Sequence, residues 1–362
     1  MSAVLVIGPS WVGDMVLAQS LFKLLKQQQP DTAIDVAAPD WTLPILERMP
    51  EVRRGIALPF RHRKLDLGAR LRIGRELRDG RYSQAIVLTN SLKSAILPWA
   101  ARIPQRTGFL GEFRYGLLND IRPLDKQALP MTVQRFCALG LPHQAMLPGE
   151  LPEPRLQASA DNAAAVLARL KHSPPQAPVL GLCPGAEYGP AKRWPADKYA
   201  EVAQWALSQD WAVWLFGSDK DADISRQINH MSGGRCLDLG GKTALGEVID
   251  LMALTTAVVS NDSGLMHIAA ALNKPLVAVY GSSDPHHTPP MSDRAEIAYL
   301  GLACSPCFQR TCPLGHLDCL NRLPAQSILD KLASMPGHET QDKPAAGRSG
   351  PNQNIPINTG TH

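Results

Sequence analysis

The sequence lacks an apolar run of the roughly 18 residues that a membrane-spanning helix needs. Its first residues, MSAVLVIGPSWVGD, have neither the charged start, the long apolar core nor the small-residue cleavage site of a signal peptide. We therefore expect a cytoplasmic protein, with peripheral membrane contact left open. The seven cysteines are odd in number, and in a chain that is not exported they indicate reduced thiols rather than a disulfide framework.

The first glycine-containing loop, Gly8 to Asp14 (GPSWVGD), lacks two familiar phosphate-binding fingerprints. It is not G-x-G-x-x-G, which excludes an ordinary dinucleotide site, and it has no G-K-[ST], which excludes a Walker loop. Composition excludes other classes, because 44% hydrophobic and 19% charged residues are near globular averages. Collagen, coiled coil and wholesale disorder are thereby ruled out.

What is present is an alternation of short apolar runs and amphipathic segments, typical of parallel doubly wound α/β sheets. The 362 residues suggest about two domains, and the Pro-rich stretches at 148–154 and 173–178 lie where a linker is expected. We predict domains at 1–172 and 173–335 and a disordered tail at 336–362. Strands are expected at 4–8, 33–38, 85–90, 179–183, 212–216, 236–239, 257–260 and 276–280. Helices are expected at 15–28, 65–78, 92–101, 132–139, 158–171, 196–208, 219–231, 244–254 and 263–272.

The formal net charge of +4 is unevenly distributed. Residues 51–81 hold ten Arg or Lys and four acids, a net +6, so the rest of the chain sums to −2. We call residues 51–81 the basic strip. It indicates an anionic partner, although a solvated helix face explains Arg70 to Arg81 equally well.

The loop that ends in Asp14 opens a helix after the first strand. Ligands of open α/β sheets bind where strands end and helices begin, and glycines there let the backbone approach a ligand closely. Asp14 could act as general base for a sugar hydroxyl. The alternative is that a carboxylate in a first helical turn only complements the helix dipole.

Three further loops, in the second half of the chain, also lie between the end of a predicted strand and the start of a predicted helix. Residues 184–195 combine glycines with Lys192 and Arg193, which suits a diphosphate or is an ordinary solvated pair. After Phe216, three carboxylates compete to bind a ribose, with N-capping as the alternative for the first of them: Asp219, Asp221 and Asp223. In residues 260–267, Asp262 and Ser263 are candidate N-caps of a helix whose free N–H groups form an anion site, and His267 lies one turn in.

Four cysteines lie within 16 residues, at Cys304, Cys307, Cys312 and Cys319, with His316 among them. This density could hold a structural zinc ion or, with less support, an iron–sulfur centre. The spacing fits neither standard pattern, because only one C-x-x-C is present. A compact loop of reduced thiols is the alternative.

Taken together, these segments resemble the ADP-heptose:lipopolysaccharide heptosyltransferases. The segments that carry the resemblance are GPSWVGDMVLAQSL at 8–21, PGAEYGPAKRWP at 184–195, NDSGLMHIAAAL at 261–272 and ACSPCFQRTCPLGHLDCL at 303–320. The resemblance covers about residues 1–335. It implies the GT-B fold, with two Rossmann-like domains facing a cleft, and transfer with inversion at the anomeric centre. It also implies no metal in catalysis, no cofactor beyond the substrate ADP-heptose, and no nucleic-acid partner.

The resemblance also implies residue roles. Asp14 matches the catalytic base and Lys192 the lysine that meets the donor phosphates. The other implied donor-binding residues are Gly185, Asp221 (ribose), Thr243 (adenine), Asp262, Ser263, Gly264 and His267. The implied acceptor is heptosyl-Kdo2-lipid A at the cytoplasmic face of the inner membrane, and its anionic core suits Ser10, Gly13, Arg61, Arg63 and Lys64. Two rival functions remain: another GT-B nucleotide-sugar enzyme of envelope polysaccharide synthesis, and a zinc-bearing binding protein without catalysis.

Overall fold

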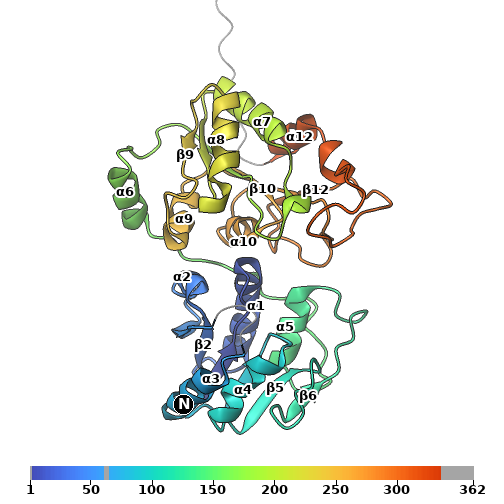
Figure 1. Cartoon of the computed structure of the whole chain (residues 1–362). Coiled ribbons are helices and arrows are strands. Elements are labelled where there is room, and N and C mark those ends of the chain that lie inside the picture. The colour runs from blue at the N-terminus through green and yellow to red at the C-terminus, as the bar shows by residue number, and fades with distance from the viewer. Residues whose placement is uncertain (1, 61–64, 336–362) are drawn as a thin grey trace, which may run out of the picture.

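The computed structural model describes residues 2–60 and 65–335, which form two lobes (Figure 1). Each lobe is built on a six-stranded parallel sheet. The first has the order β3-β2-β1-β4-β5-β6 and the second β12-β11-β10-β7-β8-β9. The first-sheet strands are β1 (Ala3–Ile7), β2 (Ala33–Pro39), β3 (Val52–Leu58), β4 (Gln84–Val87), β5 (Gln105–Phe109) and β6 (Asp120–Arg122). The second-sheet strands are β7 (Val179–Cys183), β8 (Ala212–Leu215), β9 (Leu237–Asp238), β10 (Ala257–Asn261), β11 (Leu276–Val279) and β12 (Ala295–Ala298).

Helices connect the strands and cover the sheets. In the first half they are α1 (Val12–Gln28), α2 (Leu43–Leu46), α3 (Leu67–Glu76), α4 (Leu92–Ala100), α5 (Thr132–Gly140) and α6 (Ala160–Arg169). In the second they are α7 (Ala196–Ser208), α8 (Ala222–Met231), α9 (Leu245–Met252), α10 (Gly264–Ala271), α11 (Asp318–Asn321) and α12 (Ala325–Ser334). Across the described ranges, no helix is both long and apolar enough to cross a bilayer.

The central strands confirm the sequence-based expectations, while several edge strands were not predicted. Strands β1, β7 and β10 are buried along their whole length and read as apolar runs. Strand β3 (VRRGIAL) lies at a sheet edge with exposed arginines, and β5 (QRTGF) begins with polar residues, so neither has that pattern. Strand β12 (AEIA) is a second edge strand with two exposed residues. The pattern missed β3 and β12 because edge strands need no apolar residues on both faces. It missed β5, an interior strand between β4 and β6, because that strand begins with polar residues.

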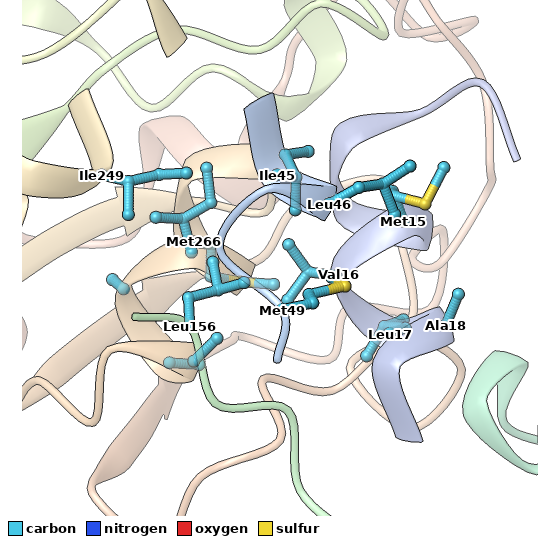
Figure 2. Close-up of a cluster of buried hydrophobic side chains, with 14 of the residues drawn as sticks. Met15, Val16, Leu17, Ala18, Ile45, Leu46, Met49, Leu156, Ile249 and Met266 are labelled. Carbon is cyan, nitrogen blue, oxygen red and sulfur yellow. The ribbon is translucent and has the colours of Figure 1, made fainter. Parts of the chain in front are cut away.

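One hydrophobic cluster continues from the first lobe into the second. Figure 2 shows side chains of α1 and of the α2 region, including Val16 and Ile45, gathered with Ile249 of α9 and Met266 of α10. Helix α1 packs on α10, and α2 packs on α9. The two lobes therefore share an apolar interface on one side, which fixes how the loops at the carboxyl ends of the two sheets face each other.

Helix α6 lies beside the second lobe (Figure 1). It packs against α9, and Arg169 forms an ion pair with Glu247 at 2.8 Å. The sequence prediction placed this helix in the first domain, within 1–172. The predicted tail, 336–362, lies outside the described residues.

Candidate active site

The site forms where the N-termini of α1 and α10 meet. A Cβ atom built on Gly13 would lie 2.6 Å from Cδ2 of His267, and one built on Gly264 would lie 2.6 Å from Cγ1 of Val12. Both glycines are therefore required for the close approach of the two helices. The structure thus brings Gly13 of one lobe, predicted to contact the acceptor, against Gly264 and His267 of the other, predicted to contact the donor.

Asp14 occupies the first turn of α1 and faces the second lobe. Burial raises its pKa from 3.8 to about 6, while the charge of Lys192 lowers it and that of Asp262 raises it. Two charged groups of the second lobe therefore act on a carboxyl of the first lobe. A carboxylate with a pKa near 6 is ionised at neutral pH and can still accept a proton, as a general base must.

Lys192 and Asp262 form an ion pair, with 2.5 Å between Nζ and Oδ2. Both side chains are largely buried, at 17% and 5% exposure. The hydroxyl of Ser283 donates a hydrogen bond to the same Oδ2. Asp262 thus holds Lys192 in place near the N-terminus of α10, which begins at Gly264. The free backbone N–H groups there favour an anion.

His267 is buried at 5% exposure. Burial lowers its pKa to about 4, so the imidazole is neutral at physiological pH. Its Nδ1 is buried without a hydrogen-bond partner among the described residues. A neutral ring can donate one hydrogen bond, whereas the positive charge at this site comes from Lys192.

The capping residues differ from those expected. Ser263 is the N-cap of α10, but its side chain makes no capping hydrogen bond, and Asp262 pairs with Lys192 instead of capping. After β8 a short 3-10 helix, Asp219–Asp221, has Ser218 as its N-cap, and α8 follows with Asp221 as its N-cap. The proposed capping role of Asp219 is therefore wrong. The physical reason is that Asp221 accepts hydrogen bonds from both the backbone N–H and the hydroxyl of Ser218, at 3.0 and 2.7 Å.

Asp221 faces Gly185 of the neighbouring loop. A Cβ on Gly185 would lie 2.4 Å from the carboxyl carbon of Asp221, so only glycine leaves room there. Next to this pair is an open cavity of about 540 Å³. It is lined by Arg169, Ser218, Asp219, Gly241, Lys242, Thr243, Ala244 and Glu247. Thr243 contributes a buried hydroxyl without a partner in the part of the chain that is described. The cavity is large enough for a nucleoside.

Much of the basic strip has structural partners. Arg53 and Arg54 pair with the buried carboxylate of Asp35, at 2.8 and 3.0 Å. Arg70 is buried and donates to the carbonyl of Leu65, and Arg78 donates to that of Ala100. The interpretation of 70–81 as a solvated face is therefore wrong for Arg70, although Arg72, Arg75 and Arg81 are exposed.

Three of the predicted acceptor contacts lie outside the described residues: Arg61, Arg63 and Lys64. Ser10, also a predicted acceptor contact, is half-exposed, and its carbonyl accepts a hydrogen bond from Trp41.

The cysteine-rich segment folds as an irregular loop beside the Lys192 loop. Cys304, Cys307, Cys312, His316 and Cys319 line one small cavity together with Ala191 and Ser282. All seven cysteines are free thiols, and over the described ranges no three His, Cys, Asp or Glu side chains are grouped as ligands of a metal ion. The reduced-thiol and zinc interpretations of this segment both stay predictions.

Sequence reasoning missed three residues that contact this machinery. Ser283 lies in a Gly-Ser-Ser turn after β11, a loop position that the strand pattern could have flagged. Tyr188 lies in the segment that was singled out for its glycines and Lys192, and Arg310 lies in the cysteine-rich segment. Neither residue belongs to the motif for which its segment was chosen. The sequence shows that one segment has an aromatic ring and the other an arginine, but only the tertiary fold brings the two into contact.

Comparison with known proteins agrees with this geometry. Residues 70–318 match glycosyltransferase family 9 (heptosyltransferase). Lipopolysaccharide heptosyltransferase 2 of Salmonella typhimurium is 44% identical over 345 residues, covering 93% of this chain and 99% of that protein. Lipooligosaccharide heptosyltransferase 2 of Haemophilus influenzae is 47% identical over 308 residues, covering 82% and 88%.

The solved ADP-heptose lipopolysaccharide heptosyltransferase II of Escherichia coli superposes with a TM-score of 0.82. The two sequences are 43% identical, and the match covers 92% of this chain and 97% of that one. This similarity confirms the predicted GT-B arrangement of two Rossmann-like lobes. An E. coli heptosyltransferase solved with ADP, 19% identical with a TM-score of 0.66, shares the fold.

Proposed function

This chain belongs to glycosyltransferase family 9, the heptosyltransferases, and from that premise we propose its substrates and the roles of its residues. The proposed donor is ADP-L-glycero-D-manno-heptose. The proposed acceptor is the first heptose of the lipopolysaccharide inner core, carried on heptosyl-Kdo2-lipid A. The observation that carries the proposal is the meeting of Asp14 of the first lobe with Lys192, Asp262 and His267 of the second. A non-catalytic zinc-bearing protein would have no use for that arrangement.

In the proposed reaction, an acceptor hydroxyl attacks the anomeric carbon of the donor heptose and inverts it. The proton of that hydroxyl passes to Asp14, whose pKa of about 6 leaves it ionised at pH 7. The bond between the anomeric carbon and the phosphate oxygen breaks, and its electron pair leaves with ADP. Lys192 and the N-terminal amides of α10 stabilise the charge that develops there, and neutral His267 donates a hydrogen bond.

The donor's nucleoside is assigned to the second lobe. Asp221 is proposed to accept hydrogen bonds from the ribose, with Gly185 leaving the space beside it. The cavity that contains Thr243 suits the adenine. The half-exposed Ser10 and Gly13 are proposed to border the acceptor, together with Arg61, Arg63 and Lys64. The reaction as proposed needs no metal and no cofactor beyond the donor, and no nucleic-acid partner.

The test of this function is transfer from ADP-heptose to a mono-heptosylated core acceptor. Asp14→Asn is expected to bind ADP as the unaltered protein does, while transfer falls by about 10²-fold or more, because the proton has no acceptor. Asp31→Asn is the matched control, since Asp31 is an exposed carboxylate just after α1. Transfer by Asp14→Asn at the rate of the control would exclude Asp14 as the base. Turnover of UDP-sugars but not of ADP-heptose would exclude the proposed donor.

We further propose that the protein is cytoplasmic and contacts the inner membrane peripherally. The loop between β5 and β6 exposes Phe113 and Tyr115 at 88% and 63%. Between them, Arg114 is fully buried and donates to the carbonyls of Thr89 and Phe109, which fixes the base of the loop. Exposed aromatic side chains on a fixed loop suit the interface of a bilayer.

Sedimentation with phosphatidylethanolamine–phosphatidylglycerol vesicles tests this contact. The double variant Phe113→Ser, Tyr115→Ser is expected to lose at least half of the vesicle-bound fraction, because two aromatic side chains no longer partition into the interface. Met146→Ser, which removes another highly exposed apolar side chain, is the control. Equal binding by both variants would contradict the role of this loop.

A further inference from the structure

Two cations lie at the same aromatic ring next to the proposed donor site. Nζ of Lys192 is 5.0 Å from the centre of the Tyr188 ring, and Cζ of Arg310 is 5.1 Å from it. Lys192 and Arg310 are therefore within about 10 Å of each other. They are far apart in the sequence and reach this ring from two different loops.

The backbone fixes the loop that carries Arg310 against the loop that carries Lys192. The N–H of Ala191 donates to the carbonyl of Arg310 at 3.1 Å, and Tyr188 Oη donates to the carbonyl of Phe308 at 2.6 Å. A Cβ on Gly189 would lie 2.5 Å from the carbonyl oxygen of Arg310, so the two backbones touch. The position of Arg310 relative to Lys192 is thus built into the fold.

Within the described part of the chain Arg310 forms no ion pair with an acid, whereas Lys192 forms one. Lys192 pairs with Asp262, which cancels much of its field. Arg310 is exposed and takes part in none of the ion pairs found among the described residues. A departing nucleoside diphosphate carries two to three negative charges, more than a lysine already paired with a carboxylate can neutralise. A planar guanidinium binds phosphate oxygens in pairs and keeps its proton while doing so.

We propose that Arg310 is a second cationic ligand of the donor diphosphate, which it contacts together with Lys192. This inference rests on the proposed function, because it takes the donor to be a nucleoside diphosphate sugar. As the bond from the anomeric carbon to the phosphate oxygen breaks, the oxygen keeps the electron pair and Arg310 stabilises the negative charge. No proton is transferred to or from the guanidinium. The cysteine-rich loop then serves to present this arginine.

The experiment compares binding of ADP, AMP and adenosine by calorimetry, together with kcat and KM for transfer. Arg310→Gln is expected to weaken ADP binding by about tenfold or more and to lower kcat by at least as much. Adenosine binding should change by less than about twofold, because the nucleoside does not contact this residue. Arg310→Lys should recover part of the ADP affinity. Arg235→Gln, which removes an exposed arginine before β9, is the control for net charge.

Each outcome separates the possible causes. If Arg310→Gln binds ADP and turns over as the Arg235→Gln control does, the inference is overturned. An equal loss of ADP and adenosine affinity would also overturn it, because Arg310 would then only support the loop. In contrast, absence of ADP binding by the unaltered protein would refute the proposed function itself. A weaker dependence of ADP affinity on salt in Arg310→Gln would support a direct charge contact.

Discussion

At the scale of the residue, Asp14 shows how burial shifts the pKa of a carboxyl group. Its place in the first turn of α1 is favourable for a carboxylate, because the helix dipole and free N–H groups stabilise negative charge. Burial removes water from the same carboxyl and raises its pKa, while the charges of Lys192 and Asp262 reach it from the second lobe. The two interpretations of Asp14, as a partner of the helix dipole and as a general base, are therefore compatible with each other. The role of general base requires the two lobes to meet.

The pKa of Asp14 predicts how transfer depends on pH. Since the base must be ionised, kcat/KM should rise with pH through about 6 and level off above it. Steady-state rates from pH 4.5 to 8.5 would show this limb. Inflection near pH 4, the ordinary value for an aspartate, would mean that the carboxyl is not desolvated in the working enzyme.

The same shift predicts a stability effect of opposite sign to the activity effect. The folded-state pKa of about 6 exceeds the ordinary 3.8, so stability falls as pH rises through that window and the penalty is complete above it. Asp14→Asn removes the penalty and should raise the free energy of unfolding at pH 7.5 by up to about 3 kcal/mol. Urea melts at pH 7.5 and pH 4 would measure it, and the gain should shrink to less than about 1 kcal/mol at the lower pH.

At the scale of the element, α1 and α10 can meet because their first turns carry glycine. Gly13 admits the ring of His267, and Gly264 admits the side chain of Val12. Sequence reasoning assigned such glycines to close approach of a ligand. The structure adds that they also allow close approach of one helix to another, which brings the first turn of α1 against His267.

Gly13→Ala should therefore act on the geometry of the site. The added methyl group would lie 2.6 Å from the ring of His267, too close to be accepted without a shift of the ring or the helix. We expect transfer to fall by about tenfold or more, since small displacements at a reacting centre are costly. Gly68→Ala in α3 is the control, because a methyl group there has no atom within 4 Å. Equal activity of the two variants would show that the helices have room to separate.

The edge strand β3 shows what the prediction of strands and helices from sequence does not reveal, namely which charged side chains pair with each other. In β3, the arginines that suggested an anionic partner are partly bound to Asp35 of the neighbouring strand, which is fully buried. A basic side chain in the sequence does not reveal whether its carboxylate partner lies in the protein or in a ligand. Only the pairing of β3 with β2 settles it for Arg53 and Arg54.

At the scale of the whole molecule, Asp250 joins the two lobes on the side of the shared apolar cluster. It is fully buried in α9 and pairs with Arg48 of the first lobe at 2.6 Å. It also accepts hydrogen bonds from the N–H of Ser159 and the side chain of Asn162, at the start of α6. One carboxylate therefore holds together the first lobe, the connecting segment and the second lobe.

Asp250→Ala is expected to destabilise the protein by about 3–5 kcal/mol, because it leaves Arg48 and two other donors without their acceptor. Denaturant unfolding would measure the loss. Glu201→Gln provides the control, since it removes the acid of an exposed pair with Lys198 and should change stability by no more than about 1 kcal/mol. If the two variants unfold alike, Arg48 finds another partner or water when Asp250 is absent.

The sequence by itself determined two α/β halves, the loops proposed to carry the chemistry, and the family. Those follow from local patterns: apolar runs such as Ala257–Asn261, a strand followed by a helix start, and short motifs such as Asp262 to His267. These features depend on residues close together in the chain, and periodicity and capping are local physics.

Only the tertiary structure decided which charges are free and which are already paired. Arg70 is buried, Lys192 is bound to Asp262, and Arg310 has no acid beside it in the described structure. The charges that act on the buried carboxyl of Asp14 likewise come from Lys192 and Asp262, which are remote from it in the chain. Electrostatic energy and burial depend on distances between segments remote in the chain, and the fold alone sets those distances.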